Sequence, residues 1–371
     1  MTMSLQASTL AGLGASSAET AELLAYNQNV FDLGSLGTET RFPLSDEPFV
    51  AFWEEVEREA RERGAFAVLR EKLPQLRFPI RAGISETEGY RAATRRGVAV
   101  ESIAEATGLE LERPEAVEVV LHTSPAGRIP LVIGRRRPEF VAVLRALTRK
   151  NEPAPVPDAQ GALMVSGYNN WARIRALGGD FRSLQERKEL YQDRFILLSN
   201  GPYSAVPAGE LGLGEEEWRE VSLVLRRDHE CAHYLTRRLF GSMRNNLLDE
   251  LIADYAGLVG ATGRFRAGWF LRFVGLEDYP RYREGGRLDL YRGKPPLSDG
   301  AFRVLQSLVK AAAENLERFD AMDTPGPRDA TGSAVRIAAL ASLRLEDLAA
   351  EGAPERLGGL VATLGERLGS A

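Results

Sequence analysis

The chain has 371 residues, and at about 150 residues per domain this length predicts two or three domains. Hydrophobic residues make up 44% and charged residues 27% of the chain, which is ordinary globular usage and excludes a disordered or fibrous protein. The formal net charge of −5 argues against a nucleic-acid-binding protein, for which a basic surface is typical.

The first part of the chain predicts a mixture of helices and strands. Residues 1–40 are rich in Ser, Thr and Gly, with one short helix expected over Ala18–Tyr26. A second helix is expected over residues 45–63, where apolar residues recur at three- and four-residue spacing: Phe49, Phe52, Trp53 and Val56. Ser85 and Glu88 have the spacing of a capping box and predict a further helix start.

A β-hairpin and a linker follow. Val117–Thr123 and Ile129–Gly134 are β-branched, apolar segments joined by a turn that contains Pro and Gly, so they predict a hairpin. A helix over residues 138–150 comes next, and residues 151–158 then hold three prolines. We therefore expect a domain boundary there, with a mixed domain over 1–150 and a second domain over 159–371.

The second part is expected to be mostly helical. Strands are predicted over Leu163–Val165 and Phe195–Leu198, and the latter could be an edge strand that accepts an extended peptide. Long helices are predicted over residues 215–240, 245–260, 298–321, 330–344 and 353–369. The predicted fold class is α+β, with a mixed N-terminal domain and a helical C-terminal domain.

Neither a membrane protein nor a disulfide-bonded one is indicated. Cys231 is the only cysteine, so no intramolecular disulfide can form. No run of about 18 apolar residues is present, and the N-terminus lacks the pattern of a secretory signal. We expect a soluble, cytoplasmic protein that binds neither nucleic acid nor a membrane.

The residues that suggest chemistry lie on the helix predicted over 215–240. His229, Glu230 and His233 form an H-E-x-x-H pattern, and the chain has only three histidines. Residues four apart on a helix project from the same face, so the two imidazoles can bind one Zn²⁺ ion. Glu230 lies beside that face, where it can reach water on a bound metal without binding the metal itself.

The next helix offers a third ligand. Glu250 and Asp254 lie four residues apart on it, and the turn between the two helices is short. A metal-binding carboxylate at Glu250 would leave Asp254 one turn further on, where it can accept the second N–H of a metal-binding imidazole. Glu250 is therefore the expected third metal ligand and Asp254 its supporting carboxylate.

These two motifs together resemble the gluzincin group of zinc metallopeptidases, which pair H-E-x-x-H with E-x-x-x-D on a later helix. The E-x-x-A-D form is similar to that of the M48-type peptidases, and the likeness covers roughly residues 215–260. The resemblance implies that His229, His233 and Glu250 bind zinc and that Asp254 orients His229. It also implies that Glu230 is the general base and acid in the hydrolysis of a peptide or protein substrate.

Such a site also needs a donor for the developing oxyanion. Since no histidine follows His233, the nearest candidates are Tyr279, Tyr282, Arg283 and Tyr203, of which Tyr282 is taken as the catalytic candidate. Two other functions stay open: a non-catalytic, zinc-stabilised binding module, and a hydrolase of small amide or ester metabolites.

Three other metal interpretations are less favoured. A carboxylate-bridged di-iron site would need a second E-x-x-H pattern, which the chain lacks. Cys231 projects away from His229 on the helix and is expected in the core. His122 lies in the predicted hairpin and is expected to be a structural or a solvent-exposed residue.

Overall fold

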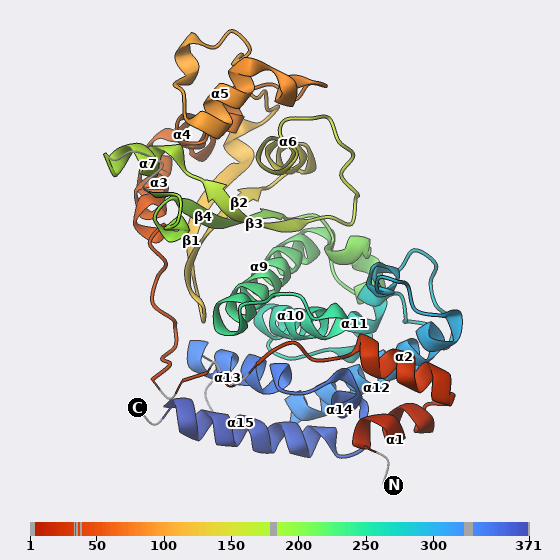
Figure 1. Ribbon diagram of the computed structural model, residues 1–371. Helices are drawn as coiled ribbons and strands as arrows, with labels where there is room; N and C mark the ends of the chain where they lie inside the picture. The colour runs from red at the N-terminus through yellow and green to blue at the C-terminus, as the bar shows by residue number, and fades with distance from the viewer. Residues whose placement is uncertain are drawn as a thin grey trace. The chain divides into compact units, whose positions relative to one another are not determined.

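The structure is a computed structural model, and it describes residues 4–32, 34, 36–37, 39–178, 184–322 and 329–369. The chain forms two compact units. A sheet unit consists of Asp46–Thr123 and Gly127–Gly201, and a helical unit consists of the chain up to Ser45, Ser124–Ala126 and Pro202 onward. Both units are coloured along the chain in Figure 1.

The sheet unit is built on a four-stranded mixed sheet of order β1-β2-β4-β3 (Figure 1). Its strands are β1 (Val117–Ser124), β2 (Gly127–Gly134), β3 (Ala162–Asn169) and β4 (Gln192–Ser199). β2 pairs with β4 in parallel, and β3 pairs with β4 antiparallel. The neighbouring strands β1 and β2 confirm the predicted hairpin. The idea that residues 195–198 form an edge strand is wrong, because β4 has hydrogen-bonded neighbours on both sides and cannot accept another strand.

The described part of the sheet unit also contains the helices α3 (Val50–Arg63), α4 (Ala65–Lys72), α5 (Glu88–Arg96), α6 (Arg137–Thr148) and α7 (Trp171–Ala176). Trp53 of α3 is fully buried, its ring lies 5.1 Å from that of Phe195, and its Nε1 donates to Asp193 at 2.9 Å. α5 begins two residues later than the predicted capping box, because the Thr87 hydroxyl and not that of Ser85 accepts from the first turn.

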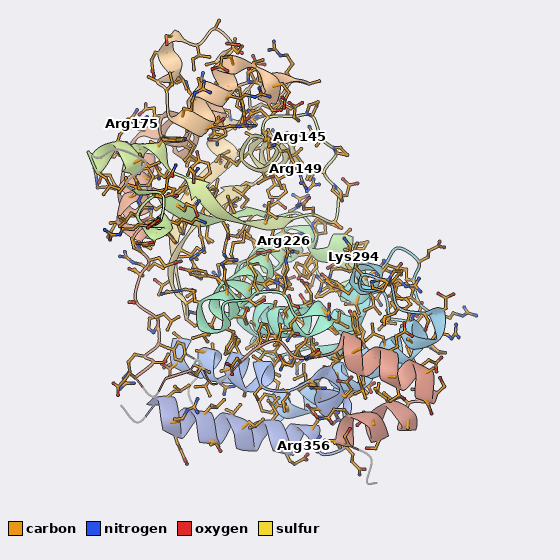
Figure 2. All side chains as sticks on the ribbon, viewed as in Figure 1. Arg145, Arg149, Arg175, Arg226, Lys294 and Arg356 are labelled. Atoms are coloured by element: carbon orange, nitrogen blue, oxygen red, sulfur yellow. The ribbon has the colours of Figure 1, made fainter. Side chains whose placement is uncertain are left out.

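The predicted domain boundary at residues 151–158 differs from the structure, in which this segment belongs to the sheet unit. Its backbone carbonyls accept hydrogen bonds from the neighbouring helix α6. Arg145, labelled in Figure 2, donates to the carbonyl of Ala154 at 2.8 Å, and Arg137 donates to that of Pro157 at 2.6 Å. The prolines therefore mark a loop tied to one unit, and the two units divide near residues 45 and 201 instead.

The helical unit contains α1 (Leu5–Gly12), α2 (Ser17–Tyr26), α9 (Glu215–Phe240), α10 (Asn246–Thr262), α11 (Ala267–Val274), α12 (Asp299–Ala321), α13 (Ala330–Ala341), α14 (Leu345–Ala349) and α15 (Ala353–Gly369). The five long helices predicted for this part are confirmed, and so is the α+β class with a helical C-terminal portion. Among the described residues, no helix is both long and apolar enough to cross a membrane.

Candidate metal centre

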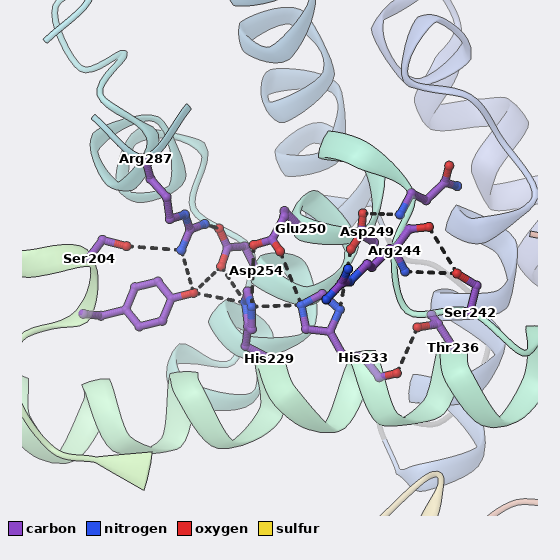
Figure 3. A network of polar contacts seen from close by, with 12 residues as sticks. Ser204, His229, His233, Thr236, Ser242, Arg244, Asp249, Glu250, Asp254 and Arg287 are labelled. Atoms are coloured by element: carbon purple, nitrogen blue, oxygen red, sulfur yellow. Dashed lines mark hydrogen bonds and ion pairs between the residues drawn. The ribbon is translucent and has the colours of Figure 1, made fainter. Parts of the chain in front are cut away.

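Helix α9 carries both histidines of the H-E-x-x-H pattern on its buried face. Their exposed fractions are 8% for His229 and 6% for His233, and Trp218 and Leu225 on the same face are fully buried. The helix ends at Gly241, whose left-handed backbone (φ 70°) suits a residue without a β-carbon. The two Nε2 atoms lie 3.1 Å apart, so both rings point at one place (Figure 3).

Helix α10 brings Glu250 to the same place. Its Oε1 lies 3.6 Å from Nε2 of His233, and its Oε2 lies 3.7 Å from Nε2 of His229. Two ligands of a tetrahedral zinc ion, each at about 2.05 Å from the metal, are about 3.3 Å apart. The three donor atoms of the described group His229, His233 and Glu250 all lie within 4.8 Å of one another, so their separation fits one small ion.

Close packing of α9 against α10 makes this convergence possible. The two helices are joined by the short segment 241–245, and Gly257 of α10 faces the backbone carbonyl of Leu225 in α9. Because glycine has no side chain, the helix backbones approach more closely there than a larger residue would permit. The helices thus form a tight hairpin that holds the imidazoles beside Glu250.

Asp254 lies in contact with His229. The Nδ1 atom of His229 donates to Oδ1 of Asp254 at 2.9 Å, and the side chain of Asp254 is fully buried. Although burial raises the pKa of Asp254, the charge of Arg287 and the hydrogen bonds from His229 and Tyr203 lower it to about 2. Asp254 is therefore an ionised acceptor at neutral pH. Burial lowers the pKa of His229, but the hydrogen bond to Asp254 and the charge of that carboxylate outweigh burial and raise this pKa above its usual value.

Asp249 is a second carboxylate next to the ligands, and the sequence analysis missed it. Its Oδ1 accepts from the backbone N–H of Asn245 at 2.6 Å, while its Oδ2 lies 3.9 Å from Nδ1 of His233. Burial, followed by the nearby charge of Glu250, raises the pKa of Asp249 to about 7. Its position directly before Glu250 was the available sequence signal.

The ligand set is electrostatically suited to a cation. Burial, together with the charge of His229, lowers the pKa of His233 to about 4, so this imidazole is neutral at pH 7 and its Nε2 can act as a ligand. Burial raises the pKa of Glu250, but the neighbouring groups His233, His229 and Arg287 outweigh burial and hold that pKa below its usual value. The Glu250 carboxylate can therefore contribute a negative charge to the ion.

Glu230 is the candidate proton carrier. Only 9% of the residue is exposed, and burial raises the pKa of its carboxyl to about 7 despite the opposing effect of His229. A general base works best when its pKa lies near the working pH. Glu230 can thus both accept and release a proton near neutral pH.

The structure separates the four oxyanion candidates. The hydroxyl of Tyr282 donates to the carbonyl of Gly286 at 2.7 Å and accepts from the N–H of Asp289 at 3.0 Å, so it ties its own loop together. Tyr279 contacts Ser307, and Arg283 pairs with Glu277. Only Tyr203, among these four, has a described contact with a metal-site histidine, at 3.0 Å from Nδ1 of His229.

Two further side chains at the centre come from the segment Arg287–Tyr291. Arg287 forms an ion pair with Asp254 and donates to the hydroxyl of Tyr203 at 2.9 Å. Burial raises the pKa of Tyr291, and so do the nearby charge of Glu250 and a hydrogen bond with that carboxylate. No motif marks either residue, so sequence reasoning had no signal for them.

The remaining metal-binding residue types lie elsewhere. Cys231 is buried in α9 with 4% exposure, and burial raises the pKa of its thiol. His122 lies on β1 of the sheet unit, one of the two strands of the predicted hairpin. The described three-residue metal group contains neither of them.

Comparison with known proteins identifies a family without identifying an activity. Neither a curated protein nor a solved structure matches the chain. One family model, described as a family of unknown function (DUF7005), matches residues 8–352, which is most of the chain. The protein therefore belongs to the family of unknown function DUF7005.

Proposed function

We propose that the protein is a zinc-dependent hydrolase and that it cleaves peptide bonds in a peptide or protein substrate. The observation that supports this most is the convergence of Nε2 of His229, Nε2 of His233 and a carboxylate oxygen of Glu250, with buried Glu230 next to His229. The resemblance of both motifs to gluzincin peptidases favours peptide hydrolysis over other metal-assisted reactions.

The donor set fits zinc better than a harder cation. Two imidazole nitrogens and one carboxylate oxygen are typical of catalytic zinc, whereas Mg²⁺ and Ca²⁺ prefer oxygen ligands only. Three protein ligands leave one position of a tetrahedral ion for water or substrate. His229, His233 and Glu250 would hold the ion.

A bound Zn²⁺ ion would supply acidity to a water molecule and polarise the carbonyl of the scissile bond. The carboxylate of Glu230 would accept a proton from that water and later return it to the leaving nitrogen, because its pKa of about 7 permits both transfers. Asp254 would keep the proton of His229 on Nδ1 throughout.

Metal content and turnover test this proposal together. We expect about one zinc ion per wild-type chain and its loss in His229→Ala. Glu230→Gln should keep the metal but lose about 10²–10⁴-fold of the hydrolytic rate. Glu217→Gln, at an exposed carboxylate in the first turn of the same helix, is the matched control and should change neither.

Each contrary result points to a specific alternative. Absence of stoichiometric metal after zinc addition overturns the proposal. Retained metal with unchanged function in Glu230→Gln overturns catalysis and supports a non-catalytic, zinc-stabilised module. Hydrolysis of a panel of small amides and esters, without cleavage of a peptide library, supports a metabolite hydrolase instead.

A further inference from the structure

Tyr203 lies in a segment that several contacts hold in place. The backbone N–H of Tyr203 donates to the Ser222 hydroxyl at 3.0 Å, and Arg226, labelled in Figure 2, donates to the carbonyl of Pro202 at 2.8 Å. The next residue, Ser204, has a left-handed backbone (φ 50°). Such a conformation costs free energy in a residue other than glycine and persists only where surrounding contacts hold it.

The ring of Tyr203 is fixed as firmly as its backbone. The guanidinium carbons of Arg226 and Arg287 lie 5.5 Å and 5.4 Å from the ring centroid, and the ring of Phe273 packs at 4.9 Å. Only 5% of Tyr203 is exposed. These contacts hold its hydroxyl beside His229 and Asp254.

That hydroxyl meets three partners but carries one proton. Arg287 can only donate, so it occupies a lone pair of the hydroxyl at 2.9 Å. The ionised carboxylate of Asp254 can only accept, so the tyrosine proton goes to its Oδ1. Arg287 also forms an ion pair with Oδ2, and both oxygens of Asp254 are therefore engaged.

The arrangement places a proton on Nδ1 of His229. This nitrogen lies 2.9 Å from Oδ1 of Asp254 and 3.0 Å from the Tyr203 hydroxyl oxygen. Without a proton on Nδ1, its lone pair would face the lone pairs of the carboxylate at hydrogen-bond distance. With the proton there, His229 donates to Asp254, and its Nε2 faces Nε2 of His233 and the carboxylate of Glu250.

We infer that Tyr203 and Arg287 are positioning residues: they hold the carboxylate of Asp254 against Nδ1 of His229, and thereby direct Nε2 of that ring toward His233 and Glu250. The inference rests on the proposed function only in naming zinc as the ion that these groups receive. The hydrogen bond between Nδ1 of His229 and Asp254 belongs to the metal-free protein and can be measured without zinc.

The test is ¹⁵N NMR of the imidazole rings in the full-length, metal-free protein. The chain has three histidines, which makes assignment practical, and His122 of the sheet unit serves as an internal reference. In wild type we expect Nδ1 of His229 to keep its proton. In Tyr203→Phe and Arg287→Met we expect a form without a proton on Nδ1 to become populated, and the Kd for zinc to rise about 10–100-fold.

Tyr255→Phe is the matched control. Tyr255 is a buried tyrosine on α10 that donates to the buried carboxylate of Asp320 at 3.0 Å, away from the ligands. Its replacement should lower the stability of the fold, because a buried hydrogen bond is lost, and leave the His229 spectrum and the zinc Kd unchanged.

Unchanged His229 signals and zinc Kd in Tyr203→Phe overturn the inference, even if the variant is less stable, because a merely structural role predicts only that loss of stability. Arg287→Met leaves the buried carboxylate of Asp254 without its ion-pair partner and can fail to fold for that reason. In that case Tyr203→Phe decides the test. Failure of wild type to bind zinc counts against the proposed function alone, since the metal-free spectra still decide the inference.

Discussion

Gly257 of α10 lies directly against the backbone carbonyl of Leu225 in α9, and a β-carbon at Gly257 would be only 2.6 Å from that oxygen. Backbone atoms cannot rotate away as a flexible side chain can, so any larger residue must push the two helices apart. The same two helices carry every proposed metal ligand. Packing at one glycine is thereby coupled to the separation of His229 and Glu250.

Gly257→Ala should therefore lower both stability and metal affinity. We expect a loss of about 1–3 kcal/mol in the free energy of unfolding, typical of overpacking, together with a higher Kd for zinc. Gly359→Ala is the control, because Gly359 lies on the exposed face of α15 and no atom lies within 4 Å of where its β-carbon would be. That change should stabilise the protein by up to about 1 kcal/mol through helix propensity, and equal effects of the two variants would contradict the argument.

Zinc should raise the thermal stability of wild type. Binding to the folded state alone stabilises it by about 2.7 kcal/mol when the free ion is at 100 times its Kd. His233→Ala removes one of the two proposed imidazole ligands and should abolish the increase in Tm. Calorimetry with Mg²⁺ in place of zinc provides the control, since a site with two imidazoles binds that cation poorly. An equal increase with Mg²⁺ would argue for a different site.

Glu346 should make stability depend on pH. Its carboxyl is fully buried, Asn27 donates to Oε1 at 2.9 Å, and Oε2 has no partner among the described residues. Burial raises its pKa in the folded protein, so the stabilising form is the protonated one. Protonated Glu346 therefore makes its full contribution to the free energy of unfolding below the pKa of the unfolded chain, about 4.3. This contribution is lost as the pH rises through the higher pKa of the folded protein.

Glu346→Gln should remove this dependence and be more stable than wild type above that folded pKa, by about 1 kcal/mol. Urea unfolding at pH 5 and pH 7.5 measures the difference. Glu351→Gln, at an exposed neighbouring carboxylate, should behave as wild type does. A pH profile that Glu346→Gln leaves unaltered would show that Glu346 is not the titrating group.

Cys231→Ala should retain stoichiometric zinc. The thiol is buried on α9 and does not belong to the described metal group. Its removal should therefore lower only the free energy of unfolding, by about 1 kcal/mol through lost packing. Elemental analysis of the purified variant checks the metal, and urea unfolding checks the stability. Loss of zinc from a folded Cys231→Ala protein would place the thiol among the ligands.

The sequence predicted the parts of this protein that depend on local pattern. Apolar periodicity and the cap at Gly241 located α9 within its observed bounds, and helical spacing alone placed His229 and His233 on one buried face. Glu250 and Asp254 were found because their spacing is also helical. Each of these predictions needed only residues within one or two turns.

Relations between distant segments were beyond the sequence. Arg287 reaches Asp254 from 33 positions away, through an irregular loop whose path no local signal describes. The prolines at residues 153–157 indicated a linker. The structure instead ties this segment to α6, because Arg137 and Arg145 donate hydrogen bonds to its backbone carbonyls. The central position of β4 likewise follows from its pairing with two other strands and not from its own residues.

The short connection between α9 and α10 has a consequence for the order of folding. Contacts between segments close in sequence form early, because little chain entropy is lost in closing a short loop. His229, His233 and Glu250 can thus meet in a helical hairpin before Tyr203 and Arg287 arrive from outside it. Zinc bound at that stage would stabilise the α9–α10 hairpin before the rest of the unit folds. We therefore expect the ion to speed refolding as well as to slow unfolding.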